Sequence, residues 1–124
     1  MAGGHPFRAI WSPGAEVALK GRYVQMQTTI DDRERAQGLV SEAVERRLAA
    51  CGQILGPIES TYWWNGSVET EKEWMCIFKT TARAAPILEA FLLEAHPYEV
   101  PEVVGFDVDL VSSDYGDWID DETE

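Results

Sequence analysis

Apolar side chains recur with two different periods in the first half of the chain. The segment 22–29 alternates, with Val24 and Met26 on one side, which predicts a strand with one buried face. The acidic pair at 31–32 resembles a capping motif and marks the start of a helix, which Gly52 is expected to end. The residues at helical spacing are Ala36, Leu39, Val40, Ala43, Val44 and Leu48.

Two longer strand-like runs, 53–64 and 67–80, flank an Asn-Gly pair at 65–66. Asn-Gly between such runs is a strong hairpin signal, because both turn positions require positive φ. A two-residue loop pairs residue i with residue 131 − i, and the Gly-Pro pair at 56–57 should cause a bend or bulge. The expected cross-strand pairs are Glu59 with Lys72, Thr61 with Thr70, and Ile54 with Ile77.

The predicted hairpin is too long for the sheet of a small domain. Its strands run about 12 residues, against a usual length of about 5–6. The outer half carries Tyr62, Trp63 and Trp64, which a monomer could not easily bury. Exposed aromatic side chains and free strand edges favour a partner, so we expect these three residues at an interface between copies of the chain.

The second half of the chain repeats the order of the first. Residues 82–95 carry a helical apolar stripe with Pro86 near its first turn, and 103–111 alternate as a fourth strand. Tyr115, Trp118 and Ile119 then follow at helical spacing. Two βαβ units joined by a hairpin predict an α+β, ferredoxin-like split βαβ fold, an antiparallel sheet with both helices on one face and a short C-terminal helix.

Composition narrows the classes of function. The chain has 22 Asp and Glu against 10 Lys and Arg, a net charge of −12, which disfavours nucleic acid and favours cations. We also expect no membrane span and no secretory signal, and therefore a cytoplasmic protein whose Cys51 and Cys76 are free thiols. Residues 1–21 are expected to form an irregular or disordered arm before a single domain at 22–124.

Five blocks of sequence resemble the CutA divalent-cation tolerance family. They are RLAACGQI around Cys51, STYWWNG, FKTT with Lys79, HPYEVPE from His96 to Glu102, and DYGDWI. The resemblance implies a homotrimer with long hairpins packing between subunits and a link to tolerance of copper and other divalent metals. The trimer of that family resembles PII signalling proteins, which implies an alternative role in binding small molecules in clefts between subunits.

The resemblance also implies site residues. It assigns a metal-linked cysteine to Cys51 and cleft residues to Lys79, Tyr98, Glu102, Tyr115 and Trp118. Together with His96, Cys51 and Glu102 form the candidate metal set, and Lys79, Tyr98, Tyr115 and Trp118 form the candidate ligand cleft. A copper or other divalent ion is a possible ligand, and no cofactor is required.

Most candidates also have a structural interpretation. Cys51 is either a small core cysteine or a soft thiolate ligand suited to Cu(I), whereas Cys76 is expected to be core. His96 is either a cation at a helix C-terminus or a metal ligand with Glu99 or Glu102.

The other candidates remain open in the same way. Lys79 is either the partner of Glu102 in an ion pair or an anchor for an anionic ligand. Tyr115 and Trp118 are expected to pack the terminal helix onto the sheet or a neighbour. The sequence contains no nucleophile elbow, phosphate loop, CxxC or HExxH motif, so we expect a non-enzymatic protein that binds metal ions.

Overall fold

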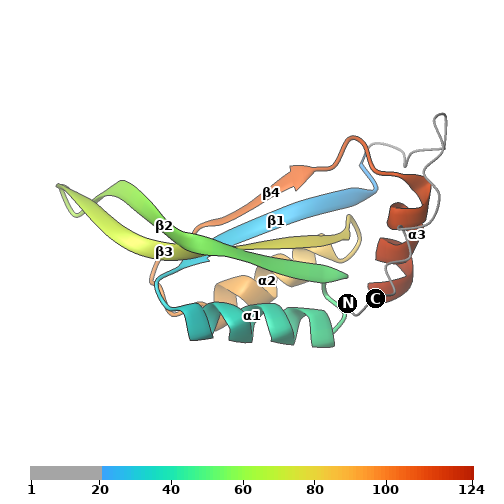
Figure 1. Cartoon of the computed structure of the whole chain (residues 1–124), viewed down its shortest axis with the longest axis horizontal. Helices are drawn as coiled ribbons and strands as arrows, with labels where there is room; N and C mark the ends of the chain where they lie inside the picture. Colours follow the sequence, from blue (N-terminus) through green and yellow to red (C-terminus); the bar gives the residue numbers. More distant parts are fainter. Residues whose placement is uncertain (1–20) are drawn as a thin grey trace.

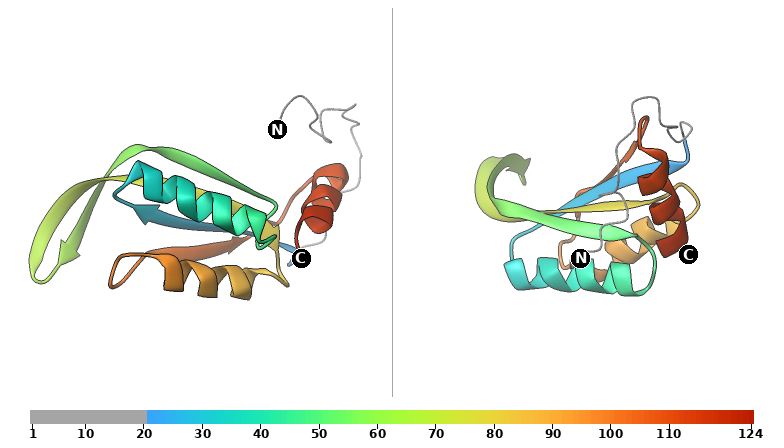
Figure 2. Two further views of the ribbon diagram at one scale, coloured as in Figure 1. Left: turned by 90° about the horizontal axis from the view of Figure 1, so that it is seen from below. Right: turned by 45° about the vertical axis from the view of Figure 1, so that its right-hand side comes forward.

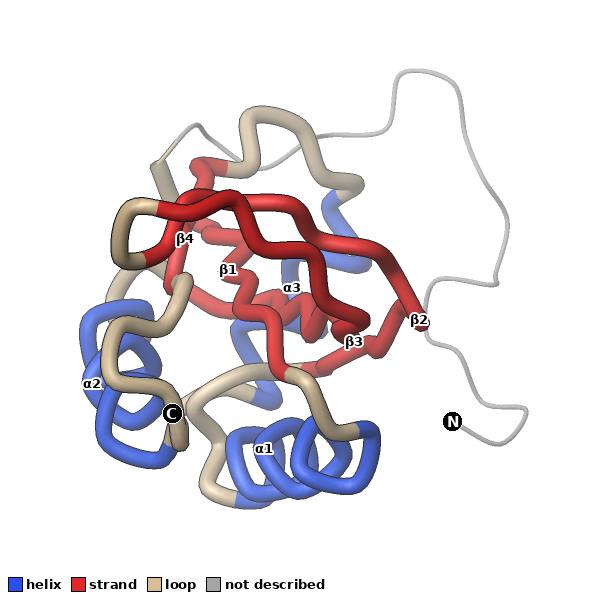
Figure 3. The backbone as a smooth tube through the Cα atoms, turned by 90° about the vertical axis from the view of Figure 1, so that its left-hand side faces the viewer, coloured by secondary structure: helices blue, strands red, loops and turns tan. Residues whose placement is uncertain are grey.

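The computed structural model describes residues 21–124, and one antiparallel sheet with strand order β2-β3-β1-β4 organises this part of the chain. Both longer helices lie on the same side of the sheet (Figures 1 and 3), which confirms the predicted α+β, ferredoxin-like arrangement. The elements are β1 (Tyr23–Ile30), α1 (Arg33–Glu45), β2 (Cys51–Trp64), β3 (Ser67–Thr81), α2 (Ala85–Ala95), β4 (Val103–Asp107) and α3 (Ser113–Glu122). The arm expected for residues 1–21 lies outside the described residues, except for Gly21.

The main core lies between the sheet and the two longer helices, which run side by side across it (Figure 2). Alternate residues of β1 and β3, including Met26, Ile30 and Phe78, point toward α1 and α2 and are almost fully buried. They meet Leu39 of α1 and Leu88 of α2. Burial of each such side chain contributes about 1.5–3 kcal/mol, so the apolar stripes explain why both helices settle on this face.

The opposite face of the sheet, here called the open face, remains largely uncovered within residues 21–124. Leu55 and Phe106 are 54% and 51% exposed on it. A row of exposed apolar side chains on a sheet favours association with another surface. The apolar residues of this face are Leu55, Met75, Ile77, Val104 and Phe106.

The register of the long hairpin confirms part of the prediction and corrects the rest. Toward the tip, Glu59 faces Lys72 and Thr61 faces Thr70, as i ↔ 131 − i requires. Toward the base, Ile54 faces Cys76, so the expected pair with Ile77 is wrong. The physical reason is the β-bulge between Leu55 and Ile58, which adds one residue to β2. The Gly-Pro pair predicted this bulge, but not its effect on the register beyond it.

Helix α1 begins as predicted but ends earlier than Gly52. Asp32 caps it by accepting hydrogen bonds from the backbone N–H groups of Glu34 and Arg35. At its other end Arg47 adopts φ 60°, and the N–H of Leu48 reaches the carbonyl of Ala43 2.9 Å away. This is a Schellman motif with arginine in the position that glycine usually takes. The prediction relied on a glycine, Gly52, and therefore placed the helix end too late.

The observed boundaries of α2 and β4 differ from the predicted ones by a few residues. Helix α2 begins at Ala85 rather than 82, because residues 82–84 form a turn in which the Thr81 hydroxyl accepts from the N–H of Ala84. Strand β4 ends at Asp107 rather than 111. No helix within residues 21–124 is long and apolar enough to cross a membrane.

Candidate functional site: a thiol cluster and a hairpin groove

The first group of candidate residues, here called the thiol cluster, lies where α3 meets the open face. It consists of Cys51, Gln53, Lys79, Tyr115 and Trp118. Cys51 begins β2 opposite Lys79, and its Sγ lies 3.6 Å from the hydroxyl of Tyr115. The Tyr115 ring stacks on Trp118 with 5.4 Å between centroids. The prediction that the terminal helix packs onto the sheet through these aromatic rings is therefore confirmed.

Burial changes the proton chemistry of this cluster. Desolvation, and then the hydrogen bond to Cys51, raise the pKa of Tyr115 above its usual value, so the phenol keeps its proton at neutral pH. Its O–H can therefore donate to the sulfur of Cys51.

Cys76, the other cysteine, lies outside this cluster. It is fully buried in the main core, and burial raises its pKa to about 11. The expectation that Cys76 is a core cysteine is confirmed.

Of the two interpretations of Lys79, the ion pair with Glu102 is wrong. The ammonium of Lys79 donates instead to the amide oxygen of Gln53 at 3.0 Å. Glu102 accepts a hydrogen bond from Nε2 of Gln27 at 3.2 Å. Because the partner of Lys79 is a neutral amide, its positive charge remains available next to the thiol of Cys51.

His96 holds the connection between α2 and β4 against β1. Its Nε2 lies 2.8 Å from the carbonyl oxygen of Thr29, and its Nδ1 lies 3.1 Å from the backbone nitrogen of Tyr98. A carbonyl can only accept and an amide N–H can only donate, which fixes the neutral tautomer with its proton on Nε2. Both ring nitrogens are thus engaged, and this conformation leaves no lone pair of His96 for a metal ion.

The second group lines a groove of about 810 Å³ beside the outer part of the hairpin, here called the hairpin groove. The hairpin itself is curved (Figure 2). Tyr98 donates its hydroxyl proton to Glu73 at 2.8 Å, and Glu73 is only 5% exposed. Burial, and then this hydrogen bond, raise the pKa of Tyr98. The carboxylates and aromatic rings of the groove are those of Asp31, Glu69, Glu71, Glu73, Glu99, Glu102, Tyr62, Trp63, Trp64 and Tyr98.

The structure does not bring the candidate metal set together within one chain. Cys51 is level with Gln25 across the sheet, whereas His96 contacts Thr29, about 13 Å farther along β1. Glu102 lies with His96 at the groove end rather than with Cys51. Within residues 21–124, no group of three or more His, Cys, Asp and Glu side chains is placed to hold a metal ion.

The candidate ligand cleft divides in the same way. Lys79, Tyr115 and Trp118 gather around Cys51, whereas Tyr98 lies in the hairpin groove. Sequence reasoning missed Gln53 and Glu73, the partners of Lys79 and Tyr98. An acidic residue flanked by Trp74 in a strand was the available signal for Glu73.

The aromatic residues at the hairpin tip are exposed in the single chain. Residues that pack between copies must be exposed in this way before the copies associate. Trp63 is 74% exposed, and Tyr62 and Trp64 are also exposed. Their place at an interface between copies remains a prediction.

The two groups of residues belong to a ferredoxin-like α+β protomer with a long hairpin, an open sheet face and a C-terminal helix beside a thiol. This arrangement and the sequence have clear relatives. The chain belongs to the family of the CutA1 divalent ion tolerance protein, whose model matches residues 24–122.

Individual relatives agree with this assignment. The "Divalent-cation tolerance protein CutA" of Pyrococcus horikoshii is 38% identical over 97 residues, which are 78% of this chain and 94% of the relative. The structure of CutA from Synechococcus elongatus is similar, with a TM-score of 0.82 and 33% identity over 88% of this chain and 96% of that one. The "Periplasmic divalent cation tolerance protein CutA" of Archaeoglobus fulgidus gives a TM-score of 0.79 at 27% identity, covering 82% and 99%.

Proposed function

We propose that this chain acts in divalent-cation tolerance as a non-enzymatic homotrimer that binds copper or a similar ion through Cys51. The observation that carries the proposal is the position of the Cys51 thiol, partly buried at the rim of an open apolar face that a second copy could cover. A thiolate is a soft ligand suited to Cu(I), and the net charge of −12 attracts cations.

Association of copies supports the metal part of the proposal. Among the described residues of one chain, Cys51 belongs to no group of three or more His, Cys, Asp and Glu side chains placed to hold a metal ion. Packing of open faces around a threefold axis would bring three thiols, or a thiol and a carboxylate such as Glu102, from different chains toward one another. The proposed ligand set therefore contains Cys51 and Glu102, and it leaves out His96, whose nitrogens are engaged.

A cytoplasmic location is part of the proposal. Cys51 lies on the open face and Cys76 in the core, so they are free thiols that do not bridge within the chain. Free thiols are typical of reducing compartments. Alkylation of both thiols during denaturing lysis of cells, without prior reduction, tests this point, and a protein recovered with oxidised cysteines would contradict it.

Titration with Cu(I) against a competing chelator tests the metal-binding proposal. We expect wild type and the Cys76→Ala control to bind Cu(I) alike, and Cys51→Ser to lose at least about tenfold in affinity, because it lacks the soft ligand. Circular dichroism checks that each variant is folded. Equal affinity of Cys51→Ser and wild type would refute the role of Cys51.

A second candidate function rests on Lys79. Its ammonium has a neutral partner, and Lys79 lies opposite Cys51, whose sulfur contacts the hydroxyl of Tyr115, which suits an anionic small molecule in a cleft between copies. Thermal-shift measurements with nucleotides and carboxylates test this candidate. Stabilisation should be lost in Lys79→Gln but kept in the control Lys72→Gln, whose lysine lies over the Trp74 ring far from the cluster.

A further inference from the structure

Helix α3 stands at the end of the sheet opposite the hairpin tip (Figure 1) and packs there through a small apolar cluster of its own. Ile119 is 1% exposed and contacts Tyr23 and Ala50, separately from the main core beneath the sheet. Gly116 permits the close approach, because a Cβ at this position would lie 3.1 Å from the Tyr23 hydroxyl. The helix is therefore docked as a separate unit.

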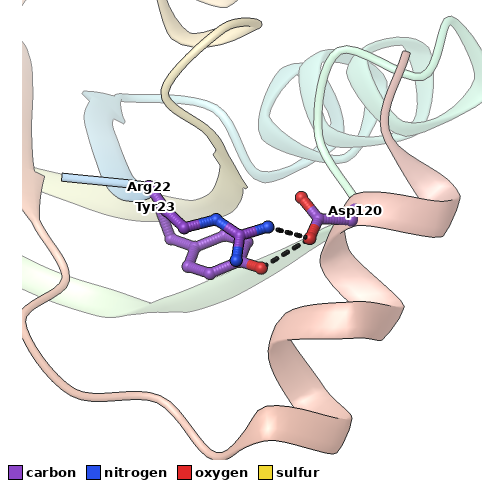
Figure 4. Close-up of polar contacts among 3 residues, drawn as sticks. All are labelled: Arg22, Tyr23 and Asp120. Atoms are coloured by element: carbon purple, nitrogen blue, oxygen red, sulfur yellow. Dashed lines mark hydrogen bonds and ion pairs between the residues drawn. The ribbon is translucent and has the colours of Figure 1, made fainter. Parts of the chain in front are cut away.

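Polar contacts near the C-terminus of α3 complete this docking. One oxygen of Asp120 accepts from the Tyr23 hydroxyl at 2.6 Å and from Nη2 of Arg22 at 2.8 Å (Figure 4). Glu122 pairs with Arg47 at 3.1 Å. Asp120 makes shorter contacts than Glu122, and of the two it alone accepts from the hydroxyl of a buried tyrosine. We therefore regard Asp120 as the principal polar docking contact of α3.

The helix has little stability of its own. It spans ten residues, and helices shorter than about 12–15 residues are marginal in isolation. Ser112 makes no side-chain cap, and the last turn holds acidic residues and no basic one, which is unfavourable at the negative end of the helix dipole. Elements held mainly by few tertiary contacts open locally without unfolding the whole protein.

What α3 covers is the candidate thiol. The hydroxyl of Tyr115 lies 3.6 Å from Sγ of Cys51, and Trp118 stacks behind that ring. When α3 undocks, the Tyr115 ring leaves the sulfur and the thiol gains access to solvent.

We propose that α3 is a lid whose docking through Asp120 controls access to the Cys51 thiol. Its significance for metal uptake rests on the proposed function of Cys51. The lid itself concerns access alone and is tested independently of any metal.

The test compares Asp120→Asn with Asp121→Asn in the assembled full-length protein, by the rate at which Cys51 reacts with the thiol reagent DTNB. Both variants remove one negative charge from the same turn, but Asp121 is exposed, and only Asp120 accepts from Tyr23 and Arg22. We expect Asp120→Asn to react about tenfold faster, as loss of a charged hydrogen bond predicts, and Asp121→Asn to react like wild type. Equal rates for the two variants overturn the lid.

Three further measurements keep the result unambiguous. Cys51→Ser should abolish the reaction that Asp120→Asn accelerates, because Cys76 is fully buried. Hydrogen exchange should speed up over Ser113–Glu122 and not over Arg33–Glu45. If Asp120→Asn is misfolded or changes the oligomeric mass, Arg22→Gln, which loses the ion pair with Asp120, takes its place, and a rate equal to that of Asp121→Asn then overturns the lid.

Cu(I) loading separates this inference from the proposed function. Faster loading in Asp120→Asn, with loss in Cys51→Ser, supports both proposals. Faster DTNB reaction together with Cu(I) affinity that is independent of Cys51 supports the lid and refutes the metal role. A Cys51-dependent Cu(I) affinity with equal DTNB rates refutes the lid alone.

Discussion

At the scale of single residues, hydrogen-bond partners decide which candidates retain free chemistry. His96 gives both ring nitrogens to the backbone of Thr29 and Tyr98. Cys51 faces a phenol, and Lys79 contacts a neutral amide, so the thiol is not bonded to the backbone and the ammonium is not paired with a carboxylate. His96, Cys51 and Lys79 became candidate site residues through residue type alone. Their hydrogen-bond partners show which of them remain able to bind a ligand.

Replacement of His96 by alanine should lower stability without changing Cu(I) affinity. The change leaves the buried carbonyl of Thr29 and the N–H of Tyr98 without partners, at a cost of about 1–3 kcal/mol. Urea unfolding measures the loss, and chelator competition measures the affinity. Unchanged stability with weaker Cu(I) binding would instead identify His96 as a ligand.

The Tyr23 phenol should make stability sensitive to alkaline pH. Burial, and then the hydrogen bond and charge of Asp120, raise its pKa from 10 to about 12. Between pH 10 and about pH 12 the unfolded chain therefore loses this proton before the folded one, so this group's contribution to stability is present below pH 10 and falls as pH rises through that range. Unfolding free energies of wild type and Tyr23→Phe should converge there, and parallel pH profiles would contradict this assignment.

At the scale of elements, close packing and irregular backbone set the limits of sequence reasoning. The alternation and helical spacing predicted every described strand and helix, because those periods reflect which face is buried. The bulge after Leu55 and the arginine in the left-handed position at 47 depend on tertiary packing, so they moved the register and the helix end. The partners of Cys51 and Tyr98 lie far away in sequence, and no local pattern could indicate them.

Two glycines of the α1–β2 region should respond to alanine in opposite ways. A Cβ at Gly52 would lie 2.7 Å from Cγ1 of Val40 and 3.3 Å from the Phe78 ring, so Gly52→Ala should destabilise by about 1–3 kcal/mol. Gly38, within α1, has open space around it, and Gly38→Ala should stabilise by about 0.5–1 kcal/mol through helix propensity. Thermal and urea unfolding compare the two, and equal effects would contradict the packing described.

At the scale of the whole molecule, two groups of exposed apolar side chains stand out, one on the open face and one at the hairpin tip. Phe106 and Leu55 lie on the open face, and Trp63 lies at the tip. Such a distribution favours association of copies over an isolated protomer. The site then depends on assembly, because Cys51 and Glu102 of one chain lie at opposite ends of the sheet.

A charge on the open face should separate the copies. We expect Phe106→Lys to lower the oligomeric mass at micromolar concentration, because it places an ammonium among the apolar side chains of the open face. The control Ile87→Lys changes a comparably exposed apolar residue of α2, on the other side of the sheet, and should keep the wild-type mass. Light scattering after gel filtration compares them, and an unchanged mass for Phe106→Lys would place the interface elsewhere.

Sedimentation equilibrium of the wild-type protein at micromolar concentration tests the central claim most directly. The account predicts a species with the mass of three 13.9 kDa chains and no substantial population of single chains. A stable, well-folded species of 13.9 kDa under these conditions would show that one chain tolerates its open face and aromatic tip uncovered, and it would contradict the account.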